Sequence, residues 1–146
     1  MRWERRRRAR RLLVQALYQQ QLAGSDADEI LAQFRLREDY GRADTEFFTD
    51  LLRAAMERRD ELDRQISAAS DIPVERIDPV ERAVLWTALT EMQGRGTGRA
   101  VAINEAIELA RQFGADHGYR FVNAVLDRWS RATPETRADP EADHAD

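Results

Sequence analysis

Apolar residues recur at intervals of three and four along most of this chain, not at intervals of two. Such spacing places side chains on one face of an α-helix, whereas a half-buried strand would alternate. Seven glycines and four prolines divide the 146 residues into segments of helical length. The sequence therefore predicts an all-α fold without β-strands.

Six helices are expected, and the spacing of their apolar residues gives each a face that can be buried. The expected helices cover residues 4–22, 27–36, 44–69, 79–93, 99–113 and about 117–131. The clearest buried faces consist of Ala9, Leu13, Ala16, Leu17 and Gln20 in the first helix, Phe48, Leu51, Leu52, Ala55, Met56, Leu62, Ile66 and Ala69 in the third, Ile103, Ala106, Ile107 and Ala110 in the fifth, and Phe121, Val122, Val125, Leu126 and Trp129 in the last.

The ends of these helices carry typical capping residues. Ser25 or Asp26 can cap the second helix, because its side chain can accept a free amide of the first turn. Asp78 is the expected cap of the fourth helix, and the proline after it fits the first helical position. Gly114 is expected to end the fifth helix in a left-handed conformation, and Asp116 to cap the last.

The longest break between helices lies at residues 71–77. This break is the expected boundary between an N-terminal subdomain at residues 1–72 and a C-terminal one at 73–131. Residues 132–146 are acidic and nearly free of apolar side chains, so they are expected to form a disordered tail.

The formal net charge of −4 hides a strong asymmetry. All 23 basic residues are arginines; residues 1–11 hold seven of them and one acid, a formal +6, while residues 132–146 carry −4. The remaining stretch therefore carries −6. Such asymmetry indicates a charged partner rather than a particular fold.

The arginine run at residues 5–11 continues directly into the first apolar face. Guanidinium groups form forked hydrogen bonds with phosphates and stack on bases. Crowded positive charges at a helix N-terminus also oppose the helix dipole, so they cost stability unless an anion offsets them. The run therefore favours nucleic-acid binding over a merely solvated helix end.

Several classes of function are disfavoured. The chain has no cysteine and two distant histidines, and its carboxylates form no evident catalytic set, so we expect no enzyme, metal or cofactor. The glycine-rich segment 94–98 follows a helix and lacks a lysine, unlike a phosphate-binding loop. No apolar run is long enough to span a membrane, and glutamines interrupt any signal-like start, so we expect a cytoplasmic protein.

Four blocks stand out by their order and spacing: residues 6–10 with 14–18, 80–85, 101–110 with 113–114, and 121–127. Together they resemble the NusB family of bacterial transcription antitermination factors. The resemblance implies an all-helical fold of two packed bundles and no enzymatic activity. It also implies binding to boxA, a single-stranded RNA signal of ribosomal RNA leaders, together with the ribosomal protein NusE. That assembly, with other Nus factors, helps RNA polymerase resist termination.

The resemblance also assigns roles to individual residues. The residues that it implies for RNA binding are Arg5, Arg6, Arg7, Arg8, Arg10, Tyr119 and Arg120. Tyr18 and Glu81 match positions on the NusE-facing side. The sequence departs from the family pattern at two places around the last turn. Ala124 stands where the family commonly has glycine, and the segment 116–118 looks shortened or altered.

Three alternatives remain beside an RNA-binding antitermination factor. One is a helical protein-interaction module, homodimeric or bound to an acidic partner, and another is a helix-turn-helix protein that binds DNA. A NusB-like domain also opens an rRNA cytosine methyltransferase, but that enzyme needs a catalytic cysteine that this chain does not contain. The sequence leaves open whether the protein, when free of its partners, covers its arginines in a homodimer.

Overall fold

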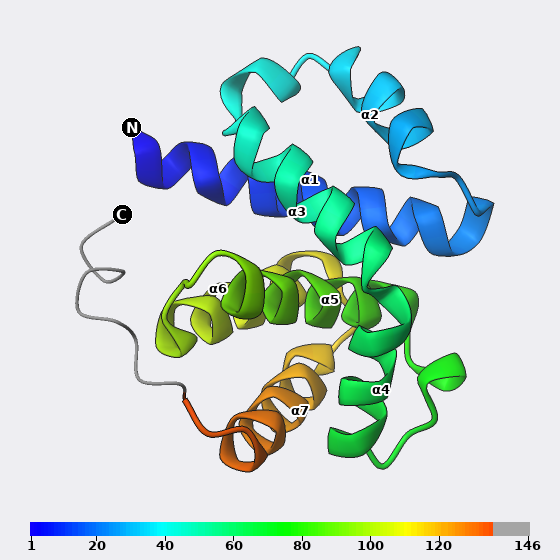
Figure 1. Ribbon diagram of the computed structural model, residues 1–146, viewed down its shortest axis with the longest axis vertical. Coiled ribbons are helices and arrows are strands. Elements are labelled where there is room, and N and C mark those ends of the chain that lie inside the picture. The colour runs from blue at the N-terminus through cyan, green and yellow to red at the C-terminus, as the bar shows by residue number, and fades with distance from the viewer. Residues whose placement is uncertain (136–146) are drawn as a thin grey trace.

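The structure is a computed structural model that describes residues 1–135 and builds them into seven α-helices and two short 3₁₀ turns (Figure 1). No strand occurs within those residues, so the all-α prediction is confirmed. The elements are α1 (Arg2–Ala23), α2 (Ala27–Arg35), η1 (Tyr40–Arg42), α3 (Thr45–Glu57), α4 (Arg59–Ala69), η2 (Val74–Arg76), α5 (Pro79–Gly94), α6 (Arg99–Phe113) and α7 (Gly118–Ala132).

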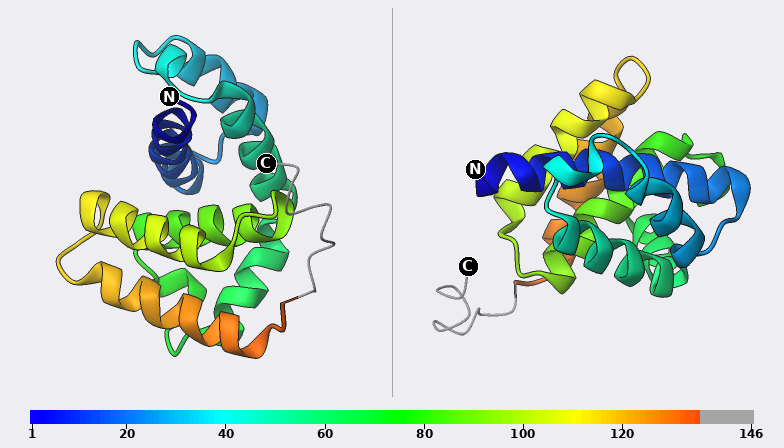
Figure 2. Two further views of the ribbon diagram at one scale, coloured as in Figure 1. Left: turned by 90° about the vertical axis from the view of Figure 1, so that its left-hand side faces the viewer. Right: turned by 90° about the horizontal axis from the view of Figure 1, so that it is seen from above.

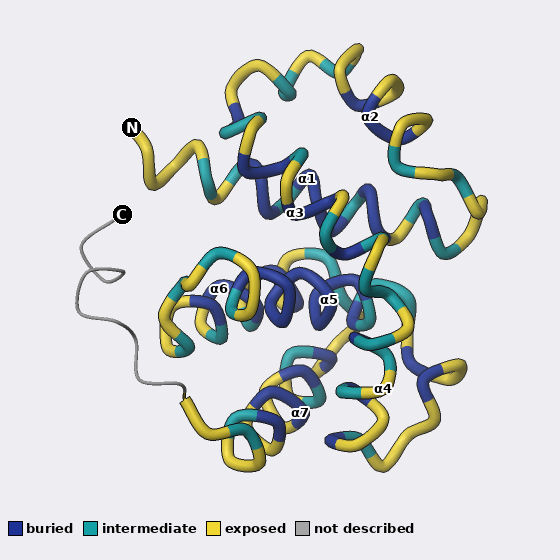
Figure 3. The backbone as a smooth tube through the Cα atoms, in the orientation of Figure 1, coloured by how far each residue is buried: buried dark blue, intermediate teal, exposed yellow. Residues whose placement is uncertain are grey.

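Helix α5 is the central element. It packs against α1, α3, α4, α6 and α7, and its residues from Ala83 to Glu91 are all buried (Figure 3). Figure 2 shows α1, α2 and α3 on one side of the α5–α6 layer and α4 and α7 on the other. The buried apolar residues form one continuous cluster through all three layers.

The expected boundary at residue 72 stays a prediction. Helix α4 precedes that point, yet it packs mainly against α5 and α7, which follow it. The expected disordered tail lies, from residue 136 onward, outside the described residues. At its start, the Glu135 carboxylate pairs with Arg99 Nε at 3.6 Å.

Two of the four predicted caps agree with the structure. Asp26 accepts a hydrogen bond from the Glu29 amide at 2.9 Å, and Asp78 accepts one from the Val80 amide at 2.8 Å. Gly24 ends α1 in the left-handed conformation, with φ at 70°. The predicted bounds of α1 and α2 and the predicted start of α5 lie within two residues of those in the structure.

The predicted single helix over residues 44–69 is wrong, because it is two helices that change direction at Arg58. The buried face of α3 packs on α1 and α5, whereas α4 turns to reach α5 and α7. Asp63 holds α4 in place: it accepts hydrogen bonds from Trp86 Nε1 at 2.8 Å and from Arg82 Nη2 at 2.6 Å. The bend thus follows from tertiary contacts and not from a proline or glycine.

The predicted caps around the α6–α7 turn are also wrong. Gly114 has φ at −83°, so it is not left-handed; it is required because a Cβ there would lie 2.5 Å from the Ala110 carbonyl oxygen. The residue that caps α7 is His117 rather than Asp116, and it adopts the left-handed conformation with φ at 67° and without a side-chain cap bond. This turn therefore differs from what its sequence indicated.

None of the helices in residues 1–135 combines the length and the apolar character that a membrane crossing demands.

Candidate nucleic-acid interface

The arginines of α1 do not share one environment, because the helix turns them toward different neighbours. Ala9, Leu13 and Leu17 are buried as predicted, and Arg10 falls on the same face. Its side chain is 2% exposed and forms a forked ion pair with Glu91, at 2.5 Å from Nη2 and 3.0 Å from Nε. The predicted RNA-binding residue Arg10 therefore lies inside the protein and cannot touch RNA in this conformation.

Arg5 and Arg6 tie α1 to the segment before α3. Arg5 Nη2 donates to the Ala43 carbonyl at 3.1 Å. Arg6 Nε lies 3.7 Å from an Asp44 carboxylate oxygen, and its guanidinium stacks on the Phe47 ring at 5.1 Å. The charge of Arg6 is thus largely engaged within the protein, while Arg5 remains exposed at the surface.

The remaining arginines of the run border two adjoining cavities of about 300 and 330 Å³ between α1, α6 and η1. Arg11 and Gln112 line both cavities, so the two adjoin, and we call them together the arginine groove. The arginines that line it are Arg7, Arg8, Arg11, Arg42 and Arg111, from three different elements.

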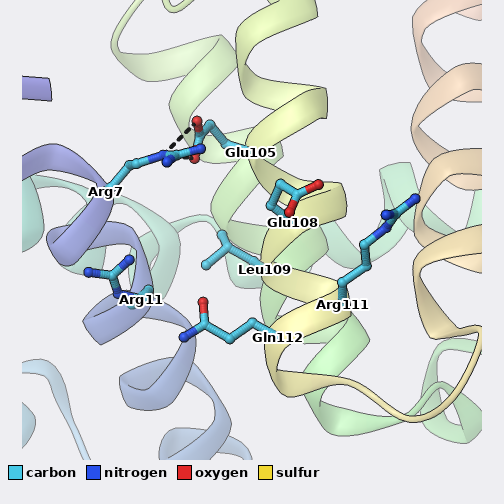
Figure 4. A pocket seen from close by; sticks show the side chains of 7 residues that line it. All are labelled: Arg7, Arg11, Glu105, Glu108, Leu109, Arg111 and Gln112. Atoms are coloured by element: carbon cyan, nitrogen blue, oxygen red, sulfur yellow. Dashed lines mark hydrogen bonds and ion pairs between the residues drawn. The ribbon is translucent and has the colours of Figure 1, made fainter. Parts of the chain in front are cut away.

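Charge in the arginine groove is only partly neutralised. Figure 4 shows Arg7 directed at Glu105, with Nε 3.2 Å from both carboxylate oxygens. By contrast, Arg11, Arg42 and Arg111 form no ion pair with a carboxylate anywhere in residues 1–135. Guanidinium groups held at a surface without a carboxylate partner are suited to bind phosphate.

The predicted pair Tyr119 and Arg120 extends this surface through Arg111. In Figure 4 Arg111 leaves α6 on the side away from α1, toward α7. Its guanidinium carbon lies 4.4 Å from the centre of the Tyr119 ring, and Arg120 Nε donates to the Tyr119 hydroxyl at 3.3 Å. This hydrogen bond and the charge of Arg120 lower the pKa of the Tyr119 phenol. The site therefore offers an aromatic ring between two cations, an arrangement that suits a stacked base.

Trp3 is a further exposed aromatic beside the same arginines. Its side chain is 49% exposed, and the guanidinium carbon of Arg7 lies 5.9 Å from the ring. The other two tryptophans, Trp86 and Trp129, are buried. The fluorescence of Trp3 is thus a natural reporter of anything that binds at the start of α1.

Tyr18, predicted to face NusE, lies on a different surface. It borders a cavity of about 510 Å³ with Val14, Leu22, Phe34 and other residues of α1, α2, α5 and α6. Leu22 is among the most exposed apolar side chains, and Tyr18 is exposed as well. An apolar depression with exposed tyrosine and leucine has the composition of a protein-binding surface.

Glu81, the other residue predicted to face NusE, is buried and only 6% exposed. It sits in the first turn of α5. Burial, reinforced by a hydrogen bond with the Asp78 carboxyl, raises the pKa of Glu81 to about 7. The same hydrogen bond lowers the pKa of Asp78.

The raised pKa of Glu81 makes the stability of the protein depend on pH. Between about pH 4.5 and 7 the unfolded chain loses the Glu81 proton while the folded one keeps it, so the free energy of unfolding falls as pH rises. Between pH 4.5 and 7.5 we expect the free energy of unfolding to fall by about 1 to 3 kcal/mol less in Glu81→Gln than in the wild type. Urea unfolding at the two pH values measures the difference. Equal falls in the wild type and the variant would contradict the assignment.

Arg11, Arg42, Arg111 and Trp3 were not among the predicted site residues. Arg11 was within reach of sequence reasoning, because it lies four residues after Arg7 and so on the same side of α1. Arg42 and Arg111 are brought to the groove by the packing of η1 and α6, which the sequence did not reveal. Within residues 1–135 no group of three or more acidic or histidine side chains is placed to hold a metal ion.

Comparisons of the sequence and of the structure with known proteins point to the same family. A family model described as the NusB family matches residues 7–131. The transcription antitermination protein NusB of Halorhodospira halophila is 44% identical over 136 residues, which cover 92% of this chain and 86% of that protein. The structure of T. maritima NusB superposes with a TM-score of 0.76 at 29% identity, over 95% of this chain and 96% of that one.

A second solved structure has the same fold at lower identity. It is a crystal structure of the antitermination factors NusB and NusE in complex with dsRNA, matched with a TM-score of 0.70 at 21% identity over 91% of this chain and 99% of that one. At this identity the likeness concerns the fold alone.

Proposed function

Because the chain belongs to the NusB family of transcription antitermination proteins, we propose that it binds boxA-like single-stranded RNA of ribosomal RNA leaders together with NusE. In this role it works in the cytoplasm with other Nus factors and helps RNA polymerase resist termination. The family is one of antitermination proteins, not of enzymes. The observation that carries the proposal is the arginine groove, with three arginines that no carboxylate within residues 1–135 neutralises.

The proposed RNA path runs along the arginine groove and ends at Tyr119. Arg8, Arg11 and Arg42 would hold phosphates, because their guanidinium groups line the groove. Arg111 and Arg120 flank the Tyr119 ring, which would stack on a base. Trp3 offers a second stacking surface at the other end, beside Arg7.

Arg6 and Arg10 take a different part in this proposal. Both guanidinium groups are held against α3 or α5, so they position α1 and do not contact RNA. Tyr18 and Leu22 would contact NusE through the apolar cavity around them. The neighbour that contains NusE and dsRNA supports the choice of partners, although its RNA is double-stranded.

A protein-interaction module without RNA specificity is the second candidate. The observation in its favour is the apolar cavity beside Tyr18, which adjoins an exposed leucine and carries little charge. A homodimer would use such a surface as readily as NusE. The two candidates differ in the part that RNA plays: the antitermination factor binds RNA together with NusE, whereas the interaction module binds its partner without it.

Titration of the full chain with RNA, with NusE and with both together tests the proposal. We expect quenching of Trp3 fluorescence by single-stranded boxA RNA, tighter binding when NusE is present, and an affinity that falls steeply with salt. The controls are a single strand of scrambled sequence, the boxA sequence as a duplex RNA, and duplex DNA. NusE binding that RNA does not strengthen at any salt concentration would favour the interaction module, and preference for duplex DNA would favour the helix-turn-helix alternative.

A further inference from the structure

The buried carboxyl of Glu81 packs directly on Gly118, the first residue of α7. A Cβ built on Gly118 would lie 2.9 Å from Glu81 Cδ and closer still to Oε1, so no larger residue fits there while Glu81 keeps its place. Glu81 Oε2 is buried and has no hydrogen-bond partner within residues 1–135. The contact is therefore one of close packing between the first turns of α5 and α7.

The backbone that carries Glu81 is held from the α5 side. It lies in the first turn of α5, which Asp78 caps, and Gln21 of α1 donates to the Pro79 carbonyl at 2.8 Å. These bonds hold the start of α5 against α1. From this anchored turn the Glu81 side chain, only 6% exposed, extends to Gly118.

On the α7 side, Gly118 is directly followed by Tyr119 and Arg120. The turn before it is tight: the Gly118 amide donates to the Ala115 carbonyl at 2.9 Å, and the Arg120 amide to the His117 carbonyl at 3.0 Å. In the same turn, His117 is the one residue other than glycine within residues 1–135 that adopts the left-handed conformation. A shift of Gly118 would therefore move the next two residues relative to Arg111.

We propose that Glu81 is a positioning residue of the RNA surface, whose packing on Gly118 sets the place of Tyr119 and Arg120. It acts from inside the protein, through α7, and not by touching NusE. The proposal rests on the proposed function for its effect on RNA. The positional effect itself is independent of any ligand.

The test combines Gly118→Ala, Glu81→Ala and the double variant in the full chain. Gly118→Ala introduces the clash, and Glu81→Ala removes the side-chain atoms that the new Cβ would meet. The double variant should therefore regain the RNA affinity that Gly118→Ala loses. We expect Gly118→Ala to weaken boxA RNA binding about tenfold and the double variant to return within about threefold of the wild type.

The pKa of the Tyr119 phenol gives a second readout that does not involve RNA. Arg120 lowers this pKa, so displacement of the turn should raise it toward the usual range for tyrosine. We expect a ¹³C-tyrosine NMR titration to show this rise for Gly118→Ala and its reversal in the double variant. Tyr40 serves as the internal reference, since its ring packs on Phe48 of α3.

Gly114→Ala is the matched control. It creates a clash in the same α6–α7 connection, but with the Ala110 carbonyl and not with Glu81. Glu81→Ala should therefore fail to rescue it. Rescue of both glycine variants, or of neither, would overturn the proposal, as would an unchanged Tyr119 titration in Gly118→Ala.

Two further outcomes separate this proposal from the proposed function. If the wild type binds no RNA, the proposed function fails while the tyrosine titration still decides the role of Glu81. If Gly118→Ala does not fold, Glu81→Ala alone decides, because removal of the carboxyl leaves Gly118 without its packing surface. In that case the Tyr119 pKa should rise, and an unchanged value would overturn the proposal.

Discussion

Replacing Arg10 with alanine is expected to lower the free energy of unfolding by about 3 to 5 kcal/mol. The variant would leave the Glu91 carboxylate buried, at 1% exposure, with Thr97 Oγ1 as its remaining hydrogen-bond donor at 3.0 Å. A charge that loses its partner in the interior keeps its full desolvation cost. Urea unfolding at neutral pH, followed by circular dichroism, measures the loss.

Two further variants show whether the loss comes from the unpaired charge. Arg10→Met combined with Glu91→Leu removes both charges at similar volume, so it should recover most of the lost stability. Arg64→Ala breaks an exposed pair with Glu61 and should cost less than about 1 kcal/mol. A loss below 1 kcal/mol for Arg10→Ala would mean that water reaches Glu91.

Arg10 also shows where sequence reasoning met its limit. It lies three residues before Leu13 and seven before Leu17, so helical spacing placed it on the buried face of α1. The resemblance to the NusB family assigned Arg10 to RNA binding, together with the rest of the arginine run. Glu91, the carboxylate that makes burial possible, is 81 residues away in the sequence. No local pattern connects the two.

What the sequence predicted well was local. The apolar spacing and the caps at Asp26 and Asp78 depend on residues within one or two turns, and the structure agrees with them. The bend at Arg58 depends instead on the contact of Asp63 with α5. The form of the α6–α7 turn likewise depends on a close approach between Gly118 and Glu81, which lie on different helices.

In the candidate site, too, the sequence did not reveal residues whose place depends on packing between distant segments. The resemblance to the NusB family identified α1 and the start of α7 as one functional surface, although they are about 110 residues apart. It did not reveal Arg111, which joins them by stacking on Tyr119. The predicted list of arginines therefore included the buried Arg10 and omitted Arg11, Arg42 and Arg111, which line the groove.

Neutralising the arginine groove is expected to weaken RNA binding by about three orders of magnitude or more. The variant carries Arg11→Gln, Arg42→Gln and Arg111→Gln, which remove three guanidinium groups that pair with no carboxylate in residues 1–135. Charge-assisted hydrogen bonds contribute roughly 1.5 to 3 kcal/mol each, and 1.4 kcal/mol corresponds to tenfold in affinity. Titration of boxA RNA at about 0.1 M salt measures the loss.

The salt dependence gives a second measure of the same contacts. Each phosphate contact to a single strand contributes about 0.7 to the slope of log affinity against log salt concentration, so the slope should fall by about 2. The matched control carries Arg64→Gln, Arg128→Gln and Arg131→Gln, three exposed arginines of α4 and α7. Both variants lose three positive charges, which takes the formal net charge from −4 to −7.

The comparison between the two variants separates local contact from long-range attraction. If RNA is held in the arginine groove, the control should bind within about threefold of the wild type and keep its salt slope, because its arginines touch no part of the proposed path. Equal weakening of both variants would mean that net charge attracts RNA without a defined groove. Full binding by the groove variant would place the RNA elsewhere, and the exposed Arg5 and Trp3 at the start of α1 would then be the next surface to test.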